Sequence, residues 1–76
     1  MKNIMKKQKL NKLADIEGMT VTEMIKEASM DTVAKAICMN QDCSYTTTME
    51  PDQDAGYCEV CGTNTVTSCL VLAGIL

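Results

Sequence analysis

The sequence contains no histidine, arginine, phenylalanine or tryptophan, and its only aromatic residues are Tyr45 and Tyr57. Without histidine, the side chain that most often acts as a general acid or base is missing. Without arginine, the residue best suited to bidentate recognition of phosphates and base edges is missing too. So few aromatic rings also leave little to stack on bases. These absences argue against histidine-dependent catalysis and against reading of nucleic acid.

Long apolar runs are also absent. The longest, residues 69–76 (CLVLAGIL), is far shorter than the roughly 20 residues that span a bilayer. The opening MKNIMKKQKLNKLADI is broken by charges and lacks the apolar core of a secretory leader. We therefore expect a cytoplasmic protein with no membrane association. In a reducing compartment, clustered cysteines indicate metal sites more readily than disulfides.

The charge is distributed unevenly along the chain, although the net value is only −3. A basic amino-terminal arm contains five lysines and no acid: Lys2, Lys6, Lys7, Lys9 and Lys12. From Ile37 onward there is no basic residue, whereas the acids are Asp42, Glu50, Asp52, Asp54 and Glu59. Phosphate binding depends on Lys and Arg displacing counterions, so the acidic half is poorly suited to nucleic acid.

The first part of the chain, residues 1–36, is predicted to be a helical hairpin preceded by the basic arm. Leu10, Leu13 and Ala14 share one helical face, and Gly18 can adopt the left-handed conformation that ends a helix. In "MTVTEMIKEA", Thr20 and Glu23 match a capping box, with Met19 and Met24 at the positions of the hydrophobic staple. Residues 29–37 remain ambiguous between a short helix and a strand.

The second part, residues 37–76, is predicted to be β-rich. "SYTTTME" alternates like a strand, "EPDQDAG" contains turn formers, and "GYCEV" can return antiparallel to it. "TVTSCLVLA" reads as a third, apolar carboxyl-terminal strand. We therefore expect a small α+β fold, in which a helical hairpin precedes a three-stranded antiparallel sheet. A chain of 76 residues has a small core, so we also expect an additional stabilising element, here called a staple: a disulfide, a metal ion or a partner.

The cysteines supply the candidate staple. Cys38 and Cys43 form C-x4-C, 14 residues follow, and Cys58 and Cys61 form C-x2-C. Two cysteine pairs separated by a hairpin-length gap are typical of a structural zinc site, in which four thiolates surround Zn²⁺ tetrahedrally. Gly62, directly after the second pair, allows a tight turn with N–H groups directed at sulfur. Cys69 stands apart and reads as a small buried apolar residue.

Other readings of the four cysteines remain open. Iron in a rubredoxin-like site uses the same four sulfurs, although rubredoxins have aromatic-rich cores and C-x2-C at both knuckles. Two disulfides would require an oxidising setting and leave one thiol over. A catalytic redox pair normally precedes a helix, whereas here a strand is expected. Four cysteines leave no open coordination position, so we expect a protein that is not an enzyme.

The cysteine motif over residues 37–72 resembles the zinc-ribbon superfamily, with Cys38/Cys43 and Cys58/Cys61 as its two knuckles. The first knuckle departs from the usual pattern in its longer loop and its lack of glycine. More broadly, "EPDQDAGYCEVCGTNTVTSCLVLAGIL" with "IEGMT" looks like small uncharacterised proteins of bacteriophages and bacteria. That resemblance implies a phage-encoded accessory protein in the host cytoplasm or the virion, and zinc ligation by the matched cysteines.

The expected function is that of a zinc-stabilised protein-interaction module, either a minor virion component or a modulator of a host complex. The uncharged stretch Leu72–Leu76 suggests docking on a larger protein or on a second copy of the chain. One alternative is a transcription accessory ribbon that contacts nucleic acid through the basic arm. A further alternative is an iron electron carrier.

Overall fold

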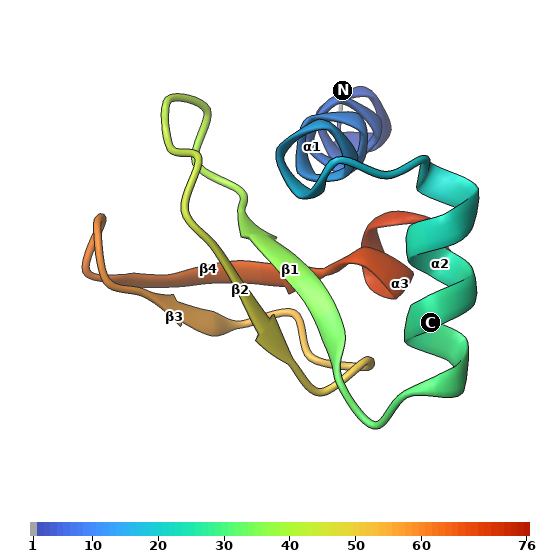
Figure 1. Cartoon of the computed structure of the whole chain (residues 1–76). Coiled ribbons are helices and arrows are strands. Elements are labelled where there is room, and N and C mark those ends of the chain that lie inside the picture. Colours follow the sequence, from blue (N-terminus) through green and yellow to red (C-terminus); the bar gives the residue numbers. More distant parts are fainter. Residues whose placement is uncertain (1) are drawn as a thin grey trace.

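The computed structural model describes the backbone of residues 2–76 and the side chains from Lys6 onward, so the side chain of Lys2 lies outside the described part. Two helices come first, followed by four strands and one helical turn (Figure 1). The elements are α1 (Lys2–Glu17), α2 (Val21–Met30), β1 (Ala34–Cys38), β2 (Thr46–Met49), β3 (Gly56–Cys58), β4 (Thr63–Ser68) and α3 (Cys69–Leu72). The α+β class is as predicted.

The predicted helix boundaries are confirmed between α1 and α2. Gly18 adopts φ +70°, and its N–H donates to the carbonyl of Asp15 at 3.2 Å, which closes the end of α1. The capping box forms in full: Glu23 N–H donates to Thr20 Oγ1, and Thr20 N–H donates to Glu23 Oε1, each at 3.1 Å. Local sequence chemistry therefore fixes where the chain turns between the two helices.

The sheet has four antiparallel strands in the order β2-β1-β4-β3, not the three expected. The additional strand is β1, which falls in the segment that the sequence left ambiguous. It pairs with β2 on one side, Ala36 opposite Thr47, and with β4 on the other, Cys38 opposite Val66. Because β1 and β4 form the centre, the short polar strand β2 and the three-residue strand β3 become the edges.

The expected carboxyl-terminal strand is wrong beyond Ser68, where the chain turns into α3. The Ser68 hydroxyl accepts the N–H of Val71 at 3.3 Å and also donates to the carbonyl of Pro51. At the far end, Gly74 has φ +77°, and Ile75 N–H donates to the carbonyl of Leu70 at 3.0 Å. A serine cap and a left-handed glycine thus bracket a helical turn in a run that resembles a strand by hydropathy.

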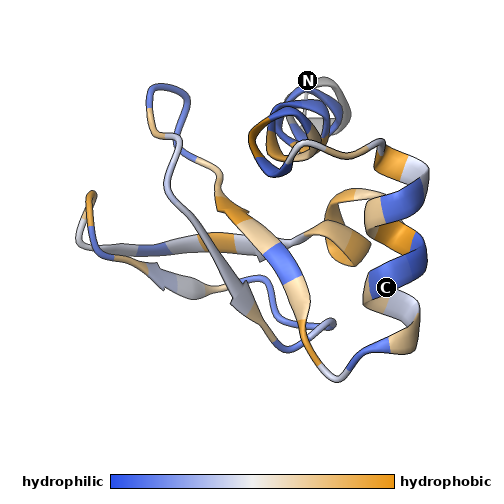
Figure 2. Ribbon diagram, viewed as in Figure 1, coloured by the Kyte–Doolittle hydropathy of each residue, from blue (hydrophilic) through white to orange (hydrophobic). Residues whose placement is uncertain are grey.

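Two small apolar clusters stabilise the fold. The larger joins α1, α2, α3 and β1 through residues that include Leu13, Met24, Ile37 and Leu70, and Figure 2 shows apolar residues where these elements meet. The smaller surrounds the cysteines and consists of Ala36, Cys38, Cys43, Cys58 and Val66. The sequence-based boundary at residues 36/37 falls inside β1, which contributes to both clusters. None of the helices in residues 2–76 has the length and apolarity to cross a membrane.

Candidate metal centre

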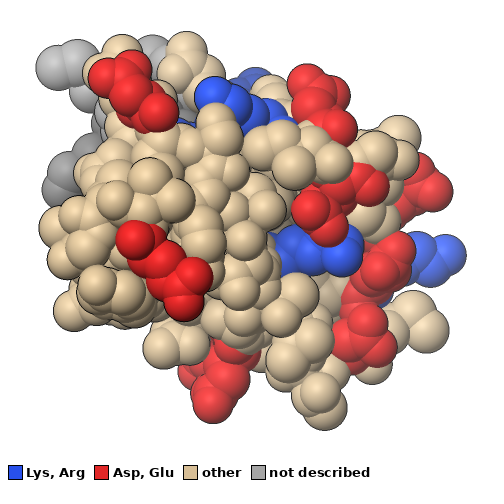
Figure 3. Space-filling view, turned by 60° about the vertical axis from the view of Figure 1, so that its left-hand side comes forward, with Lys and Arg blue, Asp and Glu red and all other residues tan. Residues whose placement is uncertain are grey.

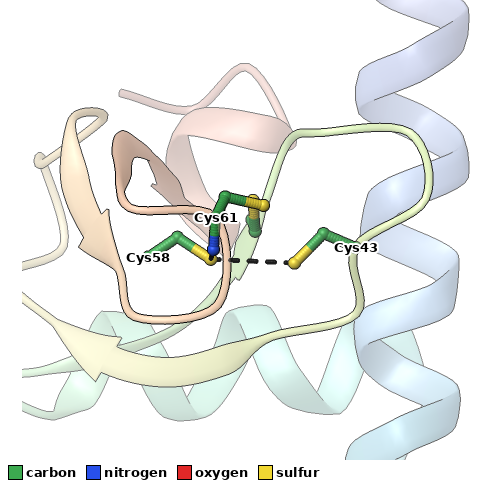
Figure 4. A group of neighbouring side chains, drawn as sticks. Cys43, Cys58 and Cys61 are labelled. Carbon is green, nitrogen blue, oxygen red and sulfur yellow. Dashed lines mark hydrogen bonds between the residues drawn. The ribbon is translucent and has the colours of Figure 1, made fainter.

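The four predicted ligand residues are brought together at one end of the sheet. The sulfur atoms of Cys38, Cys43, Cys58 and Cys61 all lie within 4.8 Å of one another. Cys43 Sγ is 3.6 Å from Cys58 Sγ, the pair joined by a dashed line in Figure 4. Cys38 Sγ is 3.9 Å from Cys61 Sγ. A tetrahedral ion with metal–sulfur bonds of about 2.3 Å places its sulfurs about 3.8 Å apart. The four side chains can therefore hold a single metal ion.

The second knuckle is built locally, by the turn between β3 and β4. The N–H of Cys61 donates to Cys58 Sγ at 3.3 Å, so the backbone supports the sulfur as the motif predicts. Gly62 has φ +72°, and its N–H donates to the carbonyl of Cys58 at 2.8 Å. A residue with a Cβ would be strained in that conformation, which explains the glycine after the second cysteine.

The first knuckle is a wider loop, from Cys38 at the end of β1 to Cys43. Its N–H groups close the loop at both ends: Cys43 N–H donates to the carbonyl of Asn40 at 3.1 Å, and Cys38 N–H donates to that of Tyr45 at 2.9 Å. No glycine is present here, and none of the described loop residues has positive φ. This loop is held in a different way from the second knuckle.

Lys9 of α1 supplies the support that the first knuckle lacks. Its ammonium group donates to the carbonyl oxygen of Asn40 at 2.5 Å and to that of Cys43 at 2.6 Å. The residue is 5% exposed, so the contact is buried. The loop that carries Cys43 passes beside α1 in Figure 4. The sequence analysis grouped Lys9 with the four other lysines of the basic arm, and no local motif distinguishes it from them.

Hydrogen bonds also tune the sulfur of Cys38. Burial alone would raise the pKa of this thiol, but hydrogen bonds from the Thr65 hydroxyl and the Asn40 backbone outweigh burial and lower the pKa to about 7. Thr65 Oγ1 lies 3.1 Å from Cys38 Sγ, and it is itself 3.1 Å from Thr63 Oγ1. Because the thiolate is the form that binds metal, this environment favours ligation near neutral pH.

Cys69 is not part of the site. It is fully buried in the helical cluster at the start of α3, as its apolar surroundings in the sequence predict. Burial raises the pKa of its thiol, so the neutral form is favoured. The fifth cysteine therefore packs as a small apolar side chain.

Among the described residues, the four sulfurs are the one group of potential ligand side chains that lies close enough to hold an ion. Comparison of the chain with protein-family models, with curated proteins and with solved structures found no match.

Proposed function

We propose that Cys38, Cys43, Cys58 and Cys61 bind one Zn²⁺ in a closed, structural site. The observation that carries this proposal is the convergence of all four sulfurs within 4.8 Å, from two loops 14 residues apart in sequence. Zinc has no geometric preference of its own and accepts the tetrahedral four-thiolate environment. With all four positions taken by protein, the ion has no site for water or substrate, so its role is to stabilise the fold.

The need for such a staple is supported by the small size of the cores. The cluster around the cysteines contains five buried residues, and three of them are proposed ligands. Without metal, little apolar packing would hold the tip of the sheet together. Because a metal site rarely exists in the unfolded chain, the binding free energy of the ion becomes folding free energy. We infer that the ion replaces the missing core at this end of the sheet.

Metal analysis of protein purified under reducing conditions, from cells grown without added zinc, tests the proposal. One zinc per chain is expected, and the double variant Cys58→Ser/Cys61→Ser should contain none. A red protein with one iron per chain would contradict zinc and favour the electron-carrier alternative, because iron occupies the same four-sulfur geometry. A stoichiometry near zero in reduced wild-type protein would contradict a metal site altogether.

We further propose that this zinc-stapled unit, a relative of the zinc ribbons, is an accessory module that docks on a protein partner. Ile75 and Leu76, which are neighbours after α3, both stay more than half exposed. Exposed apolar side chains favour protein contacts where they gather on one surface. The phage-encoded origin stays a prediction that rests on sequence resemblance.

The charges of the described surface support a protein partner over nucleic acid. Lys9, one of the five lysines of the basic arm, is buried and engaged with the first knuckle, so it is not free to contact phosphate. Figure 3 shows acidic side chains spread over one face of the molecule, with fewer lysine groups between them. Phosphate backbones would be repelled by such a face.

A further inference from the structure

Among the described residues, Lys9 is a buried cation that has no carboxylate partner. The residue is 5% exposed, and its ammonium group donates to two neutral backbone carbonyls, those of Asn40 and Cys43. Among the described side chains the structure has a single ion pair, Lys35 with Glu17 at 3.0 Å. A buried charge is strongly destabilising unless an opposite charge compensates it. The environment of Lys9 therefore calls for a nearby negative group.

The metal centre can supply that negative charge. Cys43, whose carbonyl accepts the ammonium group, is also one of the four clustered cysteines. A divalent ion ligated by four thiolates retains an excess of two negative charges. Since the carbonyl and the sulfur of Cys43 belong to one residue, the ammonium lies close to this centre. Neutral thiols or disulfides would instead leave the buried ammonium uncompensated.

We infer that Lys9 is a positioning residue and the counter-charge of the metal centre, and that it acts through the first knuckle. This inference rests on the proposed metal site. The ammonium fixes two carbonyls of the C-x4-C loop, in which no glycine relieves the backbone, and its charge offsets that of the thiolates. Partners beyond the direct ligands typically change metal affinity 10–100-fold when they are removed. Helix α1 is thereby coupled to metal binding.

Zinc affinity of the full chain, measured by competition with a chromophoric chelator, gives the first test. Lys9→Met should weaken Zn²⁺ binding about 10–100-fold. Lys12→Met makes the same chemical change at an exposed position of α1 and should leave the affinity unchanged. Lys9→Arg keeps the charge and the donors, and should bind zinc nearly as tightly as the wild type.

A second readout separates charge from packing. In protein reconstituted with iron alone, reduction adds one negative charge to the centre, so a nearby cation stabilises the reduced form more than the oxidised form. Lys9→Met should therefore lower the reduction potential of the iron centre, and Lys12→Met should not. A variant that merely loosened the fold would weaken binding without this directed shift.

Several outcomes would overturn the inference. Zinc affinity and iron potential in Lys9→Met that match those in Lys12→Met would do so directly. If Lys9→Met stays unfolded in excess zinc, Lys9→Gln is measured, because it retains a donor but no charge. A wild-type potential in that variant would show that the charge of Lys9 does not act on the metal centre. A wild-type protein that binds no metal would instead refute the proposed function, before any variant is compared.

Discussion

The ammonium nitrogen of Lys9 lies 2.6 Å from the carbonyl oxygen of Cys43, a residue 34 positions later in the chain. This contact joins α1 to the cysteine cluster, and it buries Lys9, so that Lys9 does not contribute to the exposed positive charge of the basic arm. The arm is therefore not a uniform cationic surface. Lys7 and Lys12 are exposed and Lys6 is half-buried, whereas Lys9 is buried against the loop that carries Cys43.

Replacing a cysteine of the cluster should abolish zinc binding, whereas replacing Cys69 should not. Cys58→Ser should abolish stoichiometric zinc binding and unfold the sheet, because structural zinc contributes about 10–16 kcal/mol of apparent binding energy. Cys69→Ala should retain zinc and lower the free energy of unfolding by roughly 1–2 kcal/mol, as a small truncation in the helical cluster. Zinc content and denaturant unfolding check both variants. Loss of zinc from Cys69→Ala would contradict the ligand assignment.

Gly18 and Gly62, two of the three left-handed glycines among the described residues, offer a matched comparison. A Cβ would meet nothing within 4 Å at Gly18, and only an ordinary contact at 3.8 Å at Gly62, so alanine introduces mainly backbone strain at either site. Each alanine variant should lose about 1–2 kcal/mol of stability. Only Gly62→Ala should also weaken zinc binding, because it strains the turn that carries Cys58 and Cys61. Equal zinc affinities in the two variants, by chelator competition, would argue against that role for the turn.

Acid release of zinc should depend on the Thr65 hydroxyl. Thr65 holds down the pKa of the Cys38 thiol, so Thr65→Val raises that pKa and lets protons compete with the metal at higher pH. Zinc is bound at high pH and released as the pH falls. The pH at which half of the zinc is released should be higher in this variant than in the wild type. Thr63→Val is the control, because Thr63 contacts Thr65 and Asn40 but is not within hydrogen-bond distance of a cysteine sulfur in the structure. Identical release curves would contradict the prediction.

Docking on a protein partner should depend on Ile75 and Leu76. Both side chains are more than half exposed, whereas their N–H groups bond to the carbonyl of Leu70 and close α3. Ile75→Ser/Leu76→Ser is therefore preferable to a deletion, since it keeps these backbone bonds. The double variant should reduce co-purification of a partner. Binding of the partner to the wild-type chain should depend only weakly on salt concentration.

The contrasting variant for docking is Lys7→Gln/Lys12→Gln, which removes two exposed charges of the arm. It should leave partner capture unchanged. Binding of DNA or RNA in an anisotropy assay would support the alternative function if it were lost in this variant and fell with salt. For duplex DNA the log–log slope is about −0.9 per neutralised phosphate.

Features encoded by short motifs could be predicted from the sequence. The capping box at Thr20 and the glycine after Cys61 each depend on a few consecutive residues, and the structure contains both. The convergence of the four cysteines also followed from their spacing. Each of these predictions used chemistry that is local or has a characteristic interval.

Other features escaped prediction because their signals were weak or not local. Strand β1 lies in a short segment whose alternation fits two readings, and pairing with both β2 and β4 decides between them. For α3, Ser68 before the apolar run and Gly74 after it are the cap signals that could have found the turn. The role of Lys9 depends on tertiary packing across 34 residues, and nothing near it in the sequence indicates this contact.

The two halves of the cysteine cluster therefore differ in how portable they are. The knuckle from Cys58 to Gly62 carries its own turn and its own N–H donor to sulfur within five consecutive residues. The Cys38–Cys43 loop instead borrows its support from a helix far away in the chain. The Cys58–Gly62 knuckle could be transplanted into another hairpin as a short segment. The Cys38–Cys43 loop could be transplanted only together with α1, because Lys9 supports it.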